Sequence, residues 1–240
     1  MIKGKLFVFL LMILSYSMVA QNSTRYGLKL GPLVGFQRWN YFQHDPLFKY
    51  HGNFWMESYQ DDESYSFITE LGYHLRGSAT RYLTPLQFGN KLYTIPTDEF
   101  IFRNASLLLG IKKKFPKEKV STYYSFGLRG EYTMSTNLKV YDEINKFFPV
   151  YPFDGGVKKF MVGVSFSGGI ELPFGDYTGG ILEFTIAPDI TRQYYQPQLN
   201  NIINIYAPST TTSIGEKSIK NLSLELSLGI YFTRKVTYVD

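Results

Sequence analysis

Residues 221–232 read NLSLELSLGIYF, and every second residue of this segment is large and apolar. The apolar positions are Leu222, Leu224, Leu226, Leu228, Ile230 and Phe232. Successive side chains of a β-strand point to opposite faces, so a period of two predicts a strand with one apolar and one polar face. A helix would place its apolar residues three or four positions apart, and the segment therefore excludes a helix.

The same alternation recurs along the whole chain. It predicts eight strands, at residues 26–37, 46–57, 65–80, 99–114, 121–140, 158–173, 178–192 and 218–236. Short turns at 115–119 and 173–176 alternate with long polar connections at 83–98, 141–157 and 193–217. We find no internal repeat, so the pattern indicates one antiparallel, up-and-down all-β domain.

The composition narrows the class of protein. The 240 residues contain no cysteine, 19% are charged, and no internal run is apolar enough for a membrane helix. These values exclude a disulfide scaffold, a disordered chain and a helical membrane protein. Twenty Tyr and twenty Phe residues fit the aromatic girdles of a transmembrane β-barrel.

The first residues predict export. Lys3 and Lys5 precede nine apolar residues at 6–14, which are too few to span a bilayer, and Ala20 follows. This pattern predicts a signal peptide at 1–20, cleaved after Ala20, and a barrel domain at 21–240; the alternative is an N-terminal anchor or a buried helix. Cleavage leaves 23 basic and 20 acidic residues, a balance that predicts no nucleic-acid partner.

Two all-β folds fit the alternation. In a secreted sandwich or lipocalin-like barrel the apolar faces form the core, whereas in a membrane barrel they meet lipid. The polar faces here carry Gly, Ser and isolated charges rather than the dense charge of a solvated surface, which favours a single antiparallel up-and-down transmembrane β-barrel of eight strands. An even strand number places both termini in the periplasm.

The barrel interpretation directs nine charged residues into the lumen. They are Lys29, Glu70, Arg76, Lys112, Arg129, Glu131, Glu171, Glu183 and Glu225. Five acids and four bases nearly balance, and buried charges are tolerated only when they are paired. We therefore expect a structural charge network in a lumen that side chains fill.

Three segments carry a family resemblance. YGLKLG at 26–31 resembles the first strand of the small outer-membrane β-barrel proteins of Bacteroidota, which include PorT-like and porin-family barrels. ELGY at 70–73 with Arg76 and Gly77 is similar to their third strand, and 222–232 to their last, although this chain ends on Asp240 rather than on an aromatic residue. The resemblance implies an outer-membrane location and roles that include accessory parts of secretion and assembly machinery.

The histidines predict no reaction. His44, His51 and His74 lack the spacing of a metal site, so we expect no metal and no cofactor. His44 and Asp45 imitate part of a hydrolytic triad, but adjacent residues do not orient each other well, and with Pro46 they indicate a turn. We expect no catalytic residue and no enzyme activity, with a lipid-modifying enzyme as a remote alternative.

Two further features leave alternatives open. The lysines at 112, 113, 114, 117 and 119 would bind anionic headgroups or an acidic periplasmic partner, or lie as solvated lysines at the membrane edge. The apolar residues of the last long loop would form a partner surface or cover the barrel mouth. Those residues are Tyr194, Tyr195, Ile202, Ile203, Ile205 and Tyr206.

The sequence thus favours a non-enzymatic outer-membrane barrel that serves as an accessory or structural subunit of a secretion or assembly complex. Its expected partners are outer-membrane lipids and other envelope proteins. The alternative is a conduit or binding barrel for small solutes or hydrophobic ligands.

Overall fold

The structure is a computed structural model. It describes residues 23–40, 44–59, 64–81, 86–88, 91–94, 96–116, 120–147, 151–203 and 209–235. The expected signal peptide at 1–20 lies outside these ranges. Of the helices in these ranges, none has both the length and the apolar character needed to cross a bilayer.

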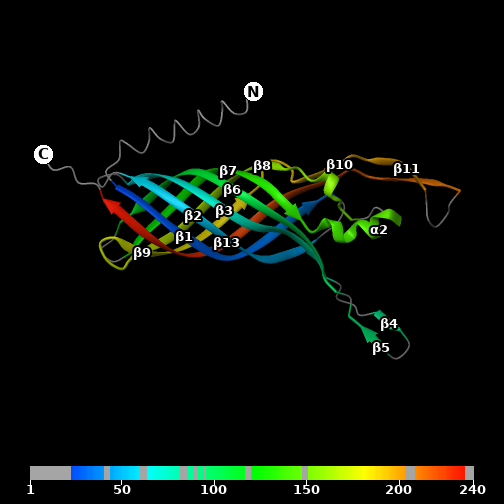
Figure 1. The fold of residues 1–240 in the computed structure, drawn as a ribbon, viewed down its shortest axis with the longest axis horizontal. Coiled ribbons are helices and arrows are strands. Elements are labelled where there is room, and N and C mark those ends of the chain that lie inside the picture. Colours follow the sequence, from blue (N-terminus) through cyan, green and yellow to red (C-terminus); the bar gives the residue numbers. More distant parts are fainter. Residues whose placement is uncertain are drawn as a thin grey trace, which may run out of the picture.

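Eight long strands form one closed antiparallel ring (Figure 1). They are β1 (Ser23–Trp39), β2 (Asp45–Tyr59), β3 (Tyr65–Thr80), β6 (Asp98–Phe115), β7 (Ser121–Thr136), β8 (Phe160–Pro173), β9 (Thr178–Pro188) and β13 (Lys217–Lys235). Each strand pairs with the next, and β1 pairs with β13 from Ser23 opposite Lys235 to Trp39 opposite Ile219. The predicted eight-stranded up-and-down barrel is confirmed.

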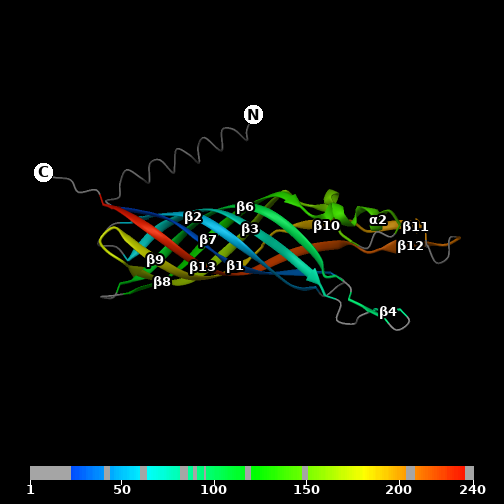
Figure 2. The ribbon, with the colours of Figure 1, turned by 60° about the horizontal axis from the view of Figure 1, so that its bottom comes forward.

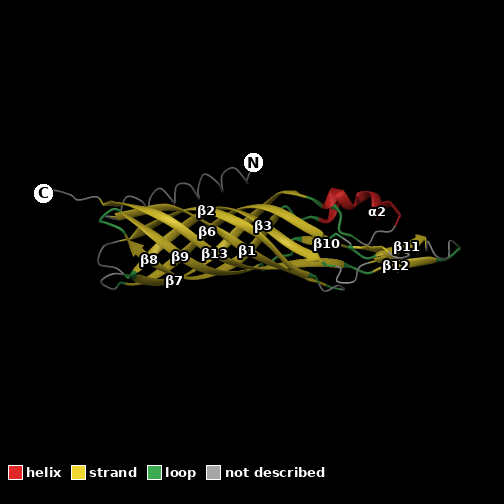
Figure 3. Cartoon of the chain, turned by 90° about the horizontal axis from the view of Figure 1, so that it is seen from below, coloured by secondary structure: helices red, strands yellow, loops and turns green. Residues whose placement is uncertain are grey.

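The two ends of the barrel differ. Ser23, Lys235, and the adjoining ends of β2 and β3, of β6 and β7 and of β8 and β9 share one end, here called the turn end (Figure 1). The opposite end, the loop end, bears the remaining elements (Figures 2 and 3). These are β4 (Leu86–Phe88), β5 (Lys91–Tyr93), η1 (Leu138–Tyr141), α2 (Asp142–Phe147), η2 (Asp154–Gly156), β10 (Tyr194–Gln196), β11 (Leu199–Ile203) and β12 (Thr211–Ile214).

Two strands end earlier than predicted. The strand predicted at 121–140 ends at Thr136 because the Asn137 side chain takes over the hydrogen bonds of the neighbouring strand. Its amide donates to the Glu99 carbonyl and its oxygen accepts from the Ile101 N–H, both at 2.8 Å. The strand predicted at 178–192 ends at Pro188, because beyond Asp189 the N–H groups of Ile190 and Thr191 both donate to the Val162 carbonyl on β8.

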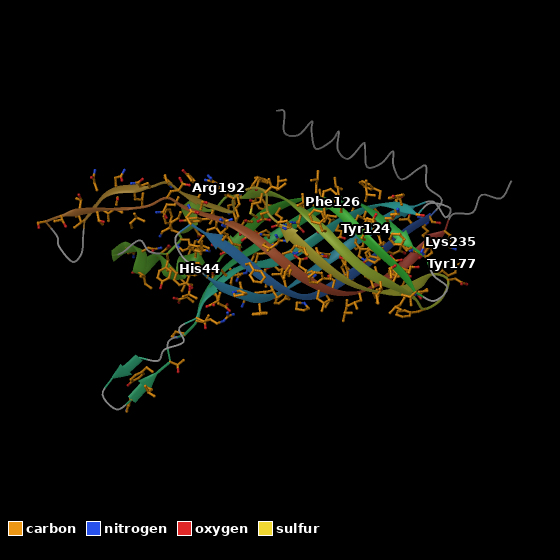
Figure 4. The ribbon with its side chains drawn as sticks, turned by 180° about the vertical axis from the view of Figure 1, so that it is seen from behind. His44, Tyr124, Phe126, Tyr177, Arg192 and Lys235 are labelled. Atoms are coloured by element: carbon orange, nitrogen blue, oxygen red, sulfur yellow. The ribbon has the colours of Figure 1, made fainter. Side chains whose placement is uncertain are left out.

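The apolar faces point outward. The exposed residues include Leu28, Leu30, Phe54, Leu71, Ile111, Tyr124, Phe126, Leu128, Phe166, Leu226 and Leu228 (Figure 4). Their polar neighbours point inward, so that Leu226 is 46% exposed and Ser227 only 1%. A sandwich would bury the apolar faces instead, and the arrangement is therefore that of a barrel whose outer wall meets lipid.

The height of the apolar band can be read along the closing seam. Outward-facing residues are apolar from Tyr26 to Phe36 on β1 and from Leu222 to Phe232 on β13. Ten residues of tilted strand rise about 25 Å, the height of the apolar band in membrane barrels. Tyr26 stacks on Phe232 at the turn end, with ring centroids 6.1 Å apart, and Phe36 pairs with Leu222 at the other edge.

One buried glycine occupies a position where a side chain would be strained. Gly77 on β3 has a φ of +156°, and a Cβ atom there would lie 1.8 Å from the carbonyl oxygen of Phe100 on β6. The missing side chain thus permits the close approach of the two strands near the loop end.

Candidate functional site

The lumen is filled by layers of side chains, and the layer nearest the turn end is a group of five charges. This turn-end group consists of Arg25, Glu57, Lys112, Lys114 and Glu171. Lys112 binds both carboxylates, and its Nζ lies 3.2 Å from Glu57. Lys114 Nζ lies 2.6 Å from Glu57, and Arg25 Nη1 lies 2.9 Å from Glu171. Three cations therefore share two carboxylates inside the wall.

An apolar layer follows the turn-end group. Trp55, Tyr123, Ile181 and Tyr231 pack together across the lumen, and each is at most 5% exposed. The ammonium of Lys112 lies 3.9 Å from the centroid of the Tyr123 ring, a cation–π contact that joins this layer to the charges below it. The layer closes the lumen at the turn end.

The central group consists of Lys29, Glu70 and Glu183. Lys29 Nζ lies 2.6 Å from Glu70 and 2.5 Å from Glu183. The three residues come from three different strands. The hydroxyl of Tyr123 donates a 2.7 Å hydrogen bond to the second oxygen of Glu183. One cation thus holds two carboxylates that would otherwise repel each other.

Two histidines form the next layer. The rings of His51 and His74 stack with centroids 5.7 Å apart. His74 uses both ring nitrogens, at 3.1 Å from Glu225 and 2.9 Å from Ser106, and His51 Nε2 lies 2.9 Å from Ser227. Both ring nitrogens of His74 are therefore used in hydrogen bonds to luminal side chains.

The arginine group, on the loop side of the histidines, consists of Arg76, Arg129, Glu131, Asp189 and Glu225. Arg76 is fully buried and contacts all three carboxylates at 3.0–3.3 Å. Arg129 contacts Glu131 and Asp189 at 2.7 Å each. Because every charge has an opposite partner, the group is compatible with burial.

Amides and aromatic rings close the loop end. Gln37, Asn104, Gln193 and Asn221 are buried and linked by hydrogen bonds of 2.6–3.3 Å. Above them Phe100, Phe102, Leu138 and Tyr141 pack together, covered by Trp39, Tyr151 and Val157. The helical segment after β7 therefore contributes to a lid over the mouth.

Little space remains between the layers. Two cavities beside the central group and the histidines have volumes of about 10 Å³ each. A single water molecule needs about that volume. Within the described residues the lumen is a packed interior, and its chemistry is that of ion pairs and hydrogen bonds.

All nine charges expected in the lumen lie there, and apart from Arg129 with Glu131 on β7 the salt bridges given above join different strands. Glu70 and Arg76, on one strand, bind different groups. Sequence reasoning missed Glu57 and Asp189, which are in phase with the inward faces of β2 and β9, together with Arg25 and Lys114. Glu57, Lys114 and Asp189 lie within the predicted strands and Arg25 one residue before the first, so the same period of two would have found them.

The lysine cluster is not one surface patch, and both interpretations of it are wrong for Lys112 and Lys114. Strand alternation directs Lys112 and Lys114 inward to Glu57 and Glu171. Lys113 points outward, between the rings of Tyr65 and Phe115. The lysines at 117 and 119 lie outside the described residues.

The apolar residues of the last long loop have different positions. Tyr194 is fully buried, and its hydroxyl accepts a hydrogen bond from the Phe153 N–H and donates one to Gln196, so it helps to cover the mouth. Ile203 is 67% exposed on β11. Ile205 and Tyr206 lie outside the described residues.

His44 and Asp45 form hydrogen bonds to different partners. His44 Nδ1 lies 3.3 Å from the Thr80 hydroxyl, whereas the Asp45 carboxylate accepts the Arg81 N–H at 2.8 Å. The His44 ring stacks on Trp39 with centroids 4.0 Å apart, and burial lowers its pKa to about 4. Across the described ranges, no group of three or more His, Asp and Glu residues is arranged to hold a metal ion.

The closed ring, the lipid-exposed outer wall and the polar interior define a small outer-membrane β-barrel protein. The sequence matches no known protein family and no curated protein.

Three solved structures illustrate the similarity. Neisserial surface protein A is 11% identical, with 86% of this chain and 96% of that chain covered and a TM-score of 0.45. The outer-membrane protease OmpT from Escherichia coli is 9% identical (90% and 98% covered, TM-score 0.45). Ail of Yersinia pestis, in complex with the heparin analogue sucrose octasulfate, is also 9% identical (88% and 99% covered, TM-score 0.43).

One of these structures corrects a prediction. We expected no enzyme activity, but the similar structures include a protease, and barrel architecture is therefore no ground for excluding catalysis. At 9% identity the likeness assigns no reaction to this chain either.

Proposed function

We propose that the protein is a closed outer-membrane barrel that holds its loop-end elements at the cell surface as an accessory or structural subunit of an envelope complex. In this proposal both termini lie in the periplasm and the loop end faces outward. The resemblance of three strands to the small barrels of Bacteroidota supports such a role.

The observation that carries the proposal is the apolar surface of the loop-end elements. Leu92 on β5, Val140 on η1, Ile144 on α2 and Ile203 on β11 are 49–74% exposed. These elements lie beyond the end of the barrel wall, where lipid does not cover them (Figure 1). We take these four side chains as the candidate contact residues, because exposed apolar surface often marks a site that binds another protein.

The packed lumen weighs against the alternative of a solute conduit. The turn-end, central and arginine groups lie in sequence along the lumen, and the apolar layer and the lid close its two ends. A solute would have to break several buried ion pairs to pass, and breaking one such pair costs about 3–5 kcal/mol.

The test is affinity purification of the tagged full-length protein from membranes in mild detergent. We expect a partner in fixed stoichiometry, and its recovery should fall when Leu92, Val140 and Ile203 are replaced by Ser. Phe174→Ser is the matched control, because Phe174 is equally exposed but lies in the turn between β8 and β9. Recovery of a lone monomer, or equal recovery with all variants, would contradict the proposal.

A further inference from the structure

Two cations face each other on the outer wall without a counterion. Arg38 on β1 lies directly opposite Lys220 on β13, and both side chains are exposed. Like charges in directly opposed positions destabilise a strand pair. Arg192, farther toward the loops, is paired with Glu216, but among the described residues no salt bridge includes Arg38 or Lys220.

The depth of this pair in the membrane is defined by the residues below it. The next outward pair is Phe36 and Leu222, which ends the apolar band at the loop end. Arg38 and Lys220 therefore lie one step beyond the hydrocarbon, at the level where lipid headgroups carry their phosphates. At the other edge of the band the corresponding pair is Thr24 and Arg234, which carries a single cation.

A groove opens at the same place. It has a volume of about 640 Å³ and is lined by the two cations together with Phe36, Gln37, Trp39, His44, Asn221 and Leu222. Phe36 and Leu222 face outward one step below the cations, whereas Trp39 and the buried Gln37 and Asn221 belong to the covered barrel mouth. An amphiphile with a phosphate at its head and acyl chains below matches this distribution, because a guanidinium forks onto phosphate oxygens while the chains cover the apolar wall.

We propose that Arg38 and Lys220 bind a phosphate group in the headgroup of an outer-leaflet glycolipid, with its acyl chains against Phe36 and Leu222. The inference rests on the proposed outward orientation of the loop end. The bound phosphate supplies the counterion that the strand pair lacks, and it fixes the lipid at the seam where the barrel closes.

The experiment measures lipid binding to the purified full-length protein by native mass spectrometry, with lipid A carrying two phosphates as the probe. Two cations near the membrane surface each strengthen such binding about fivefold, so Arg38→Gln with Lys220→Gln should weaken it about 30-fold. Arg234→Gln, which removes an exposed outward cation from the other end of β13, should leave it unchanged. Unaltered migration of the unboiled protein in gels verifies that each variant is folded.

Three outcomes would overturn the inference. They are undiminished binding by the folded double variant, equal binding of lipid A from which the phosphates have been removed, and displacement of the lipid by millimolar inorganic phosphate alone, which would indicate a site for free phosphate. Orientation is tested separately with Asn200→Cys, the sole cysteine of that variant, which an impermeant maleimide should label in intact cells. Failure of that labelling would reject the outward orientation, and partner capture tests the proposed function independently of lipid binding.

Discussion

The ammonium of Lys29 on β1 lies 2.5 Å from the carboxylate of Glu183 on β9, across a lumen in which these two strands do not pair with each other. The same ammonium holds Glu70 on β3. The side chain of Lys29 therefore connects three strands of the barrel, β1, β3 and β9.

Replacing this lysine should destabilise the barrel strongly. Lys29→Met leaves two buried carboxylates without their cation, and breaking a buried pair in this way costs about 3–5 kcal/mol. The measurement is urea unfolding of the refolded protein in detergent micelles or lipid vesicles. The triple variant with Glu70→Gln and Glu183→Gln should recover most of the loss, and a triple variant as unstable as Lys29→Met would refute the role of charge.

The second prediction tests which face meets lipid. Leu226→Arg places a charge near the middle of the outer wall and should cost about 2–4 kcal/mol of unfolding free energy. Ser227→Arg should instead prevent proper packing, because Ser227 is buried against His51 and the interior has no room for the side chain. Unfolding of both variants in vesicles checks this, with Leu226→Ala as the control, and equal tolerance at both positions would show that the phase is wrong.

The third prediction concerns Gly77. Gly77→Ala should destabilise the barrel by about 1–3 kcal/mol, because the backbone there has a positive φ and the new methyl group would meet the Phe100 carbonyl. Gly175→Ala is the matched control, since a Cβ at Gly175 meets nothing within 4 Å. Thermal unfolding of the two variants measures the difference in stability. A smaller loss of stability for Gly77→Ala than for Gly175→Ala would contradict the prediction.

The fourth prediction concerns passage through the lumen. The purified wild-type protein should show little or no steady conductance in planar bilayers, because side chains fill an eight-stranded barrel and the two luminal cavities described above have volumes of about 10 Å³ each. Uptake of sugars into liposomes should be equally poor. Large stable channels would instead favour the conduit alternative.

The fifth prediction concerns pH. Between pH 6.5 and about 4, an unfolded His44 takes up a proton that the buried His44 does not, so the stability of its packing falls as the pH drops through this window. In a Trp55→Phe variant Trp39 is the remaining tryptophan, and its fluorescence should change with a midpoint near pH 4. His44→Phe should abolish the transition, whereas a midpoint near pH 6.5 would mean that His44 is solvated.

The sequence alone predicted the barrel because one physical rule governs every strand. Apolar residues at every second position, opposed by Gly, Ser and single charges, distinguished a lipid-facing wall from a solvated one, and Leu226 and Ser227 lie as that rule requires. The partners within the lumen could not be predicted in the same way. Lys29 reaches Glu183 only because β13 lies between β1 and β9 and sets the positions of these two strands along the barrel axis. The register between strands depends on the closed ring and is not visible in a single strand's sequence.

Two predictions from short stretches of sequence were wrong, because the residue types in the stretch suggested one arrangement and the strand alternation or a neighbouring side chain imposed another. Lys112, Lys113 and Lys114 resemble a basic patch when counted together, but alternation separates them onto two sides of the wall. The prediction for β7 runs to residue 140 because Leu138 and Val140 continue the apolar alternation. The strand ends at Thr136 because the Asn137 side chain binds the backbone of Glu99 and Ile101 instead.

The pairing of β1 with β13 makes the first and last described residues, Ser23 and Lys235, neighbours. The ring cannot close until β13 has been made and has reached β1. A chain that lacks β13, through a nonsense mutation or proteolysis during export, would keep two unpaired strand edges in the bilayer, where lipid cannot form hydrogen bonds with them. Envelope quality control could therefore recognise an incomplete chain by its unpaired backbone groups alone, whatever the function of the protein.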